Sequence, residues 1–281
     1  MKNLLIACCL AFLQPLLFAA DISVGGMKLS IPAPPGYALV TDDMKPYAQL
    51  VMRFVPPGNQ QFALFVSTTD AAVAAQGVLP KAERRFVVQS AKELIPFTFT
   101  IADFAELKRT LKSQNAEILK EVQANSPALF ASVNKGIIED YKKDPNISLN
   151  QMVPFAAHYE TESALAYSTL MRLNGNDKNG QPYVWVGVTT STDVYLKGKV
   201  LFLIVYAEEK GMEWSRTASK EWAEMIVAMN SPSKVDIGVL GMISYFLRRT
   251  NWLQVGNRTL IVFLVAIVLS LLGYVIRNKK L

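Results

Sequence analysis

The chain has 281 residues, of which 51% are hydrophobic, and a formal net charge of +6. The basic excess lies at the two ends, because residues 21–247 carry a formal net charge of −1. Such a near-neutral body offers no general attraction to a polyanion, which excludes nucleic acid as the expected partner.

Residues 1–20 have the three parts of a secretory signal peptide: a basic start, an apolar segment and small residues before Asp21. Cys8 and Cys9, the two cysteines of the chain, lie inside that apolar segment. The sequence therefore predicts an exported domain over residues 21–230 without disulfides or cysteine-bound metal. A retained N-terminal anchor is the alternative.

The first half of this domain alternates strand and turn patterns. Residues 22–31 alternate apolar and polar side chains across a glycine pair, which predicts a first strand or hairpin. Further strands are predicted at 49–55, 61–68 and 84–91. An inserted helical hairpin is expected over 100–143, because Thr100 and Asp103 resemble a capping box and Ser126-Pro127 starts a second helix.

The second half reads as a β-meander followed by a helix. Strands are predicted at 152–160, 165–173, 183–192 and 199–207, with a turn at 174–180. The last helix, 213–229, carries apolar side chains at core spacing: Trp214, Trp222, Met225, Ile226 and Met229.

The C-terminal region contains a candidate membrane anchor at 258–276. Residues 259–276 carry no charge and would span roughly 27 Å as a helix, close to the thickness of a bilayer. Residues 231–257 would form a linker and a juxtamembrane interfacial helix, and 277–281 a cytoplasmic tail. The apolar piece at 237–253 could instead dock on another membrane protein or pack on the domain. The side chains expected at the membrane interface are Arg248, Arg249, Trp252, Arg258, Tyr274, Arg277, Lys279 and Lys280.

The expected fold class is α+β: an antiparallel sheet covered by helices, with the inserted hairpin and one C-terminal transmembrane helix. The segments Lys28–Pro32, Gly36-Tyr37 and Lys199–Ala207, followed by the helix at Trp214–Met229, resemble the PsbP/DcrB-like family of small secreted domains. That resemblance implies a binding or assembly module more often than an enzyme. It carries over no site residues.

No motif in the sequence specifies a reaction. His158 is the only histidine; with Glu160 and Glu162 it could share a strand face and hold a metal, but a solvated face explains it better. Ser132 and Lys135 fit a Ser-x-x-Lys pattern without its companion motifs. The polar run 189–193 is read as an exposed strand end rather than a pocket wall. No catalytic residue, cofactor or metal site is therefore expected.

These patterns predict a single-pass protein of the bacterial inner membrane, with its N-terminal domain periplasmic or extracellular and its C-terminal tail cytoplasmic. Its expected role is a non-enzymatic binding or assembly module, with the bilayer and another envelope or membrane protein as partners. One alternative is an accessory subunit of a membrane complex that docks through 237–276. The other is a hydrolase whose active site the sequence does not reveal.

Overall fold

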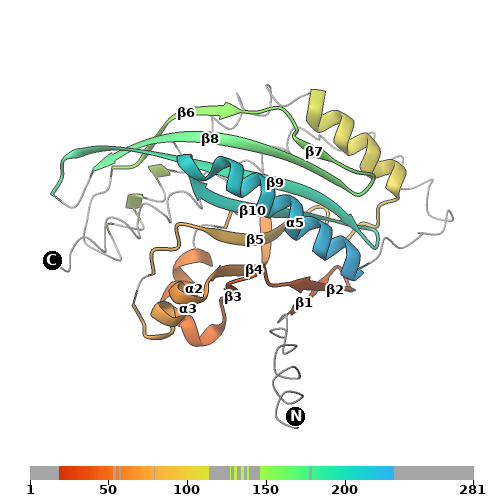
Figure 1. Cartoon of the computed structure of the whole chain (residues 1–281), viewed down its shortest axis with the longest axis horizontal. Coiled ribbons are helices and arrows are strands. Elements are labelled where there is room, and N and C mark those ends of the chain that lie inside the picture. The colour runs from red at the N-terminus through yellow and green to blue at the C-terminus, as the bar shows by residue number, and fades with distance from the viewer. Residues whose placement is uncertain are drawn as a thin grey trace, which may run out of the picture.

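The computed structural model describes residues 19–52, 55–56, 58–78, 80–113, 127, 130–131, 134–135, 138, 146–176 and 179–230. The main sheet contains β3 (Tyr37–Leu39), β4 (Asn59–Ser67), β5 (Arg85–Ala91), β6 (Ser148–Pro154), β7 (Tyr159–Glu160), β8 (Ala164–Asn176), β9 (Pro182–Leu196) and β10 (Lys199–Glu208). The strand order is β3-β4-β5-β10-β9-β8-β6, with β7 beside β8, and the pairings are antiparallel (Figure 1).

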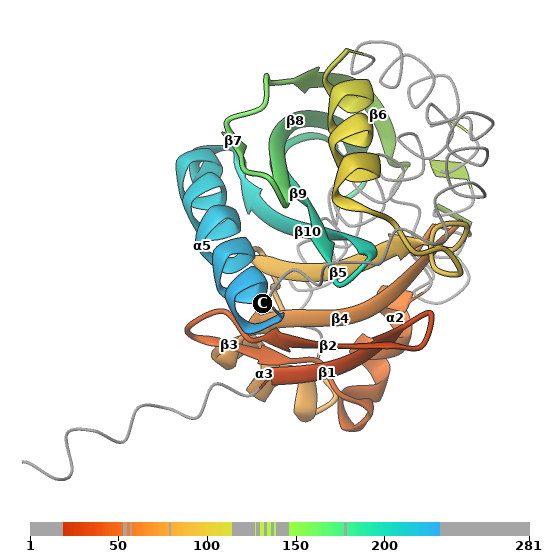
Figure 2. The same ribbon diagram turned by 90° about the vertical axis from the view of Figure 1, so that its right-hand side faces the viewer.

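Helical elements flank this sheet. They are η1 (Asp42–Met44), α2 (Lys45–Met52), α3 (Thr68–Ala75), a helix over residues 101–113, η2 (Glu209–Gly211) and α5 (Met212–Asn230). The sheet curls, so that helix 101–113 lies inside the curve and α5 outside it (Figure 2). Each face of the sheet is therefore covered by its own set of helices.

The side chains of strand β10 contribute alternately to the two halves of the core, one on each face of the sheet. Phe202, Ile204 and Tyr206 pack into the core cluster on the inner face, which includes Phe104 of helix 101–113. Leu201, Leu203 and Val205 pack into the outer cluster with Trp222 and Ile226 of α5. Because both faces are covered, the strand reads as a continuous apolar run instead of an alternating one.

The outer face also carries a separate hairpin, β1 (Ala19–Val24) and β2 (Met27–Pro32), whose alternate side chains point into the core. Helix α5 bonds to the edge of β2 with side chains. Asn230 accepts from the Ser30 N–H (3.0 Å) and donates to the Ser30 carbonyl (2.7 Å), and Trp222 Nε1 donates to the Pro32 carbonyl (2.8 Å). The helix and the hairpin are thus locked together.

Several predicted elements agree with the structure and others do not, among them the strand predicted at 152–160, which is divided between β6 and β7. The Thr100–Asp103 capping box is confirmed: the Thr100 N–H donates to Asp103 Oδ2 (2.8 Å) and the Asp103 N–H to Thr100 Oγ1 (3.2 Å). The strand predicted at 49–55 was wrong, because Lys45–Met52 form α2. A proline at position 46 suits the first turn of a helix, where no intrahelical N–H bond is lost.

The predicted fold class was also wrong. The described residues form mostly antiparallel β-sheet with α5 at their C-terminal end, in place of an α+β domain with a transmembrane helix. Strands β8 and β9, with 13 and 15 residues, are longer than predicted and shift the balance toward sheet. Most of the second half of the hairpin predicted at 100–143 lies outside the described residues.

The described part of the chain contains no helix that is both long and apolar enough to cross a membrane. Over the described residues, this finding stands against the predicted single-pass protein of the inner membrane. The segments 231–257, 258–276 and 277–281 lie outside the described residues. So do residues 1–18, whereas Ala19 and Ala20 open β1, which runs across the boundary expected after residue 20.

The turn of the β1–β2 hairpin allows a matched test of packing. Gly25 and Gly26 both have positive φ, 54° and 83°. A Cβ on Gly25 would collide with the Ile95 carbonyl and lie 2.8 Å from Lys199 Nζ, which donates to that carbonyl; a Cβ on Gly26 would meet nothing within 4 Å. We expect Gly26→Ala to lower the free energy of unfolding by about 1 kcal/mol, from conformation alone. Gly25→Ala should lower it by about 2 kcal/mol more, since backbone must shift. Equal losses in urea unfolding would contradict this packing.

Candidate functional site

An open cleft of about 590 Å³ lies where the ends of β4 and β10 and the start of β5 meet the first turn of α3. This volume falls in the range of protein sites that bind ligands. The cleft is lined by Tyr37, Ser67, Thr69, Asp70, Lys81, Glu83, Arg84, Glu208, Lys210 and Gly211. Because three of these side chains are acidic and three are basic, we call it the charged cleft.

The start of α3 forms one wall of the charged cleft. Ser67 is the N-cap: its Oγ accepts from the Asp70 N–H (3.0 Å) and donates to Asp70 Oδ2 (2.7 Å). The neighbouring Thr68 N–H donates to the carbonyl of Gly36 (3.0 Å), whose φ of +81° turns the chain into β3. These bonds hold the Asp70 carboxylate and the Tyr37 ring on the same wall.

Aromatic rings support the basic side of the cleft. The Arg84 guanidinium lies over the Trp214 ring, 4.3 Å from its centroid. Trp214 packs edge-on against Phe86 (5.9 Å between centroids), which packs in the same way against Tyr37 (4.6 Å). Stacking occupies a face of the guanidinium, so its in-plane N–H groups stay available to an anionic group.

The six charged side chains do not neutralise one another. Over the ranges that the structure describes, none of them takes part in an ion pair. Partial desolvation raises the pKa of Glu83, whose side chain stays largely exposed; repulsion from the carboxylates of Glu208 and Asp70 raises it further, and Arg84 offsets part of the rise. Burial also raises the pKa of Tyr37, an effect that Arg84 partly offsets. The cleft therefore presents crowded acids beside a cation that is stacked on an aromatic ring.

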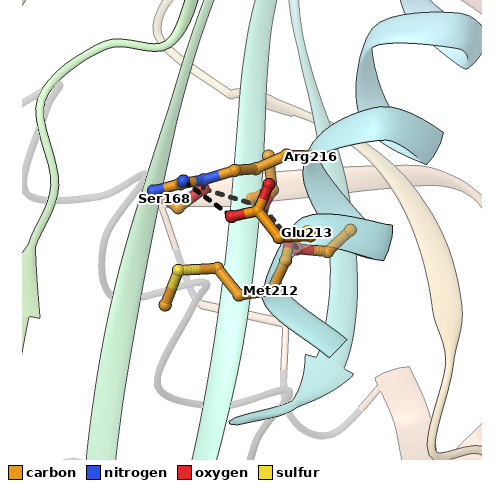
Figure 3. A network of polar contacts seen from close by, with 6 residues as sticks. Ser168, Met212, Glu213 and Arg216 are labelled. Carbon is orange, nitrogen blue, oxygen red and sulfur yellow. Dashed lines mark hydrogen bonds and ion pairs between the residues drawn. The ribbon is translucent and has the colours of Figure 1, made fainter. Parts of the chain in front are cut away.

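A second polar cluster joins β8, β9 and the start of α5 (Figure 3). Ser215 Oγ donates to the Met212 carbonyl (2.8 Å), so it must accept the hydrogen bond that it shares with Thr190 (2.8 Å). Thr190 then accepts from Ser168 Oγ (3.0 Å), which itself accepts from Arg216 Nε (3.3 Å). The hydroxyl proton of Ser168 is committed to Thr190, which does not suit a nucleophile.

His158 and Glu160, which the sequence did not favour as a metal site, have different surroundings in the structure. His158 precedes β7, half-buried, while Glu160 forms ion pairs of 3.2 and 2.8 Å with two lysines of helix 101–113. Burial lowers the pKa of His158, and the nearby positive charge of Arg216 lowers it further. Among the described residues, no group of three or more His, Cys, Asp or Glu side chains could hold a metal.

The polar run 189–193 lies inside β9 and is buried, so the prediction of an exposed strand end was wrong. Thr190 and Thr192 bond to serines of α5, at 2.8 and 2.6 Å, which satisfies their hydroxyls. Asp193 points to the other face, is 1% exposed and has Tyr167 and Ser191 as polar neighbours, while its Oδ1 has no hydrogen-bond partner among the described residues. Burial raises its pKa to about 7.

The remaining predicted positions lie elsewhere. Ser132 and all the residues expected at the membrane interface are outside the described residues: Arg248, Arg249, Trp252, Arg258, Tyr274, Arg277, Lys279 and Lys280. The sequence patterns did not indicate the charged cleft. The sequence feature that could have indicated the cleft is a pair of charged runs at strand ends. Lys81, Glu83 and Arg84 come just before one apolar strand, and Glu208 and Lys210 lie at or just after the end of another. Only the antiparallel pairing of β5 with β10 brings these two charged ends together.

No family model matches this chain, and no curated protein matches it. Among solved structures, it is similar to the Saccharomyces cerevisiae Ran-binding protein Mog1p, with 12% identity and a TM-score of 0.32 over 76% of this chain and 93% of that chain. A Mog1 variant gives 12% identity and a TM-score of 0.31 over 79% and 98%.

At these TM-scores the likeness supports no argument about function. No resemblance to PsbP/DcrB-like domains is shown, so that prediction was wrong. The similar protein is named as binding Ran, a protein partner, and nothing in the described residues of this chain supports a lipid partner.

Proposed function

We propose that this chain is a non-enzymatic binding module that recognises a protein partner through the charged cleft. The observation that carries the proposal is the set of six charged side chains around an open cleft, without ion pairs to other described residues. Charges of both signs that leave one another unpaired are suited to complementary charges on a partner, which fix register and orientation.

The hydroxyl chain of β8, β9 and α5 does not supply the nucleophile of a hydrolase. A hydrolase needs a nucleophile hydrogen-bonded to a base. Ser168 instead donates to Thr190 and accepts from Arg216, a permanent cation that takes no proton from it. The alternative of docking through 237–276 depends on a segment outside the described residues, and no observation favours it.

Site-specific photo-crosslinking in the cells that produce the full-length protein tests the proposal. Benzophenone side chains would replace Thr69 and Lys81, which line the charged cleft, and Glu221, an exposed control on α5. We expect the same discrete adduct from positions 69 and 81 and none from 221. Equal adducts at the three positions, or none from the two cleft positions, would contradict the proposal.

A further inference from the structure

The acidic side of the charged cleft is built to receive a positive charge. Glu83 precedes β5, Glu208 ends β10 and Asp70 lies in the first turn of α3, so three separate elements bring carboxylates to one cleft. Their mutual repulsion acts on Glu83, whose pKa is raised by burial, by Glu208 and by Asp70 in that order. A bound ammonium or guanidinium group would relieve this repulsion.

The basic side is built to receive a negative charge. Lys81 and Lys210 have flexible stems, but Arg84 is held against Trp214 with its centre 4.3 Å from the ring. A pre-oriented guanidinium loses little entropy when its N–H groups bond to a carboxylate. Arg84 is therefore the group that would fix the position of an anion.

The balance of charge narrows the class of ligand. With three acids and three bases, the charged cleft has no net formal charge to attract a polyanion or a polycation. Because Glu83 and Arg84 are adjacent in the chain and both line the cleft, the two ligand charges must also be close together.

Resting on the proposed function, we infer that the charged cleft recognises a peptide segment in which a basic side chain stands next to an acidic one. The basic side chain lies between Glu83 and Glu208, and the acidic one bonds to Arg84. A short, exposed loop or tail of a partner protein meets this requirement. Its binding is sensitive to salt, because the cleft is open to solvent.

The probes that test this inference are capped tetrapeptides with a central Lys-Asp pair, and two versions in which norleucine replaces Lys or Asn replaces Asp. Amide NMR shifts of the ¹⁵N-labelled full chain at 67–70, 81–84 and 208–211 would report binding at the charged cleft. We expect the Lys-Asp peptide to bind roughly tenfold more tightly than either partly neutral peptide, a typical size for one charged hydrogen bond.

Two variants test the two charge contacts separately and should have opposite effects on the two binding preferences. Arg84→Gln should remove the preference for Asp over Asn and keep that for Lys over norleucine. Glu83→Gln should do the reverse. Lys45→Gln and Glu221→Gln, at exposed positions away from the cleft lining, should change neither preference.

The outcomes separate this inference from the proposed function. If the three peptides bind the cleft equally while the crosslinks at positions 69 and 81 persist, the charge-pair inference is wrong and the binding module stands. If those crosslinks are absent, the proposed function is wrong. If no peptide shifts the cleft amides, the inference is wrong whatever the crosslinks give.

Discussion

Trp222→Ala is expected to lower the free energy of unfolding by about 3–5 kcal/mol, the usual range for truncating a buried aromatic side chain. Trp222 is 1% exposed and packs edge-on against Phe65 (5.9 Å) and Phe86 (5.1 Å), at the centre of the outer core. Its loss would leave a cavity between α5 and the sheet. It would also leave the Pro32 carbonyl without its Nε1–H donor.

Trp222→Phe separates these two effects. Phenylalanine keeps much of the ring packing but cannot donate to the Pro32 carbonyl, and leaving that buried acceptor unpaired should cost about 1–3 kcal/mol. Urea unfolding of both variants, followed by circular dichroism, would measure the difference. If Trp222→Ala costs no more than Trp222→Phe, then the ring does not hold α5 on the sheet as described.

Asp193→Asn is expected to make the protein more stable at neutral and alkaline pH, an unusual result for a buried residue. Asp193 has an ordinary pKa of 3.8 when unfolded and about 7 in the folded protein, because burial disfavours its charged form. Between these values the folded state keeps a proton that the unfolded state releases. The free energy of unfolding must therefore fall as pH rises from about 4 to about 7.

The size of this fall in the free energy of unfolding follows from the difference between the two pKa values of Asp193. Roughly three pH units at about 1.4 kcal/mol each amount to a loss on the order of 4 kcal/mol, complete above pH 7. The substituted amide side chain would be neutral at every pH, so this fall should be absent from the Asp193→Asn variant. Urea unfolding at pH 4, 6 and 8 would measure it, with Asp42→Asn, which alters an exposed carboxylate, as the control. Parallel curves for Asp193→Asn and the unmodified protein would contradict the prediction.

Local patterns in the sequence predicted local structure well. The glycine pair at 25–26 marked the β1–β2 turn, the capping box marked the start of the helix at 101, and the strand predicted at 84–91 is β5. The core positions predicted on α5 were only partly right. Trp222 and Ile226 are buried, but Met229 is 50% exposed. The residues that approach the sheet instead include Ser215 and Ser219, small polar side chains that a search for apolar spacing passes over.

What the sequence did not reveal depends on contacts between distant residues. The run 189–193 looks solvated because it is polar, yet α5 supplies hydroxyl partners that make its burial possible. The charged cleft likewise combines side chains from positions 37 to 211 through the pairing of strands that are far apart in the chain. The residues around a buried hydroxyl in the sequence do not show which group will bond to it. The residues around a strand end likewise do not show which strand will lie beside it.

The bonds from α5 to β2 have a consequence for self-association. An uncovered strand edge is a template on which another chain can add a strand. Here, Asn230 presents its amide to Ser30 as a neighbouring peptide group would, with one acceptor and one donor, and Trp222 satisfies the next outward carbonyl. Side chains of α5 thus form the hydrogen bonds to the edge of β2 that the backbone of a neighbouring strand would otherwise form. Asn230, the last residue of α5, therefore holds the hairpin in place and also hinders a strand of another chain from pairing with the edge of β2.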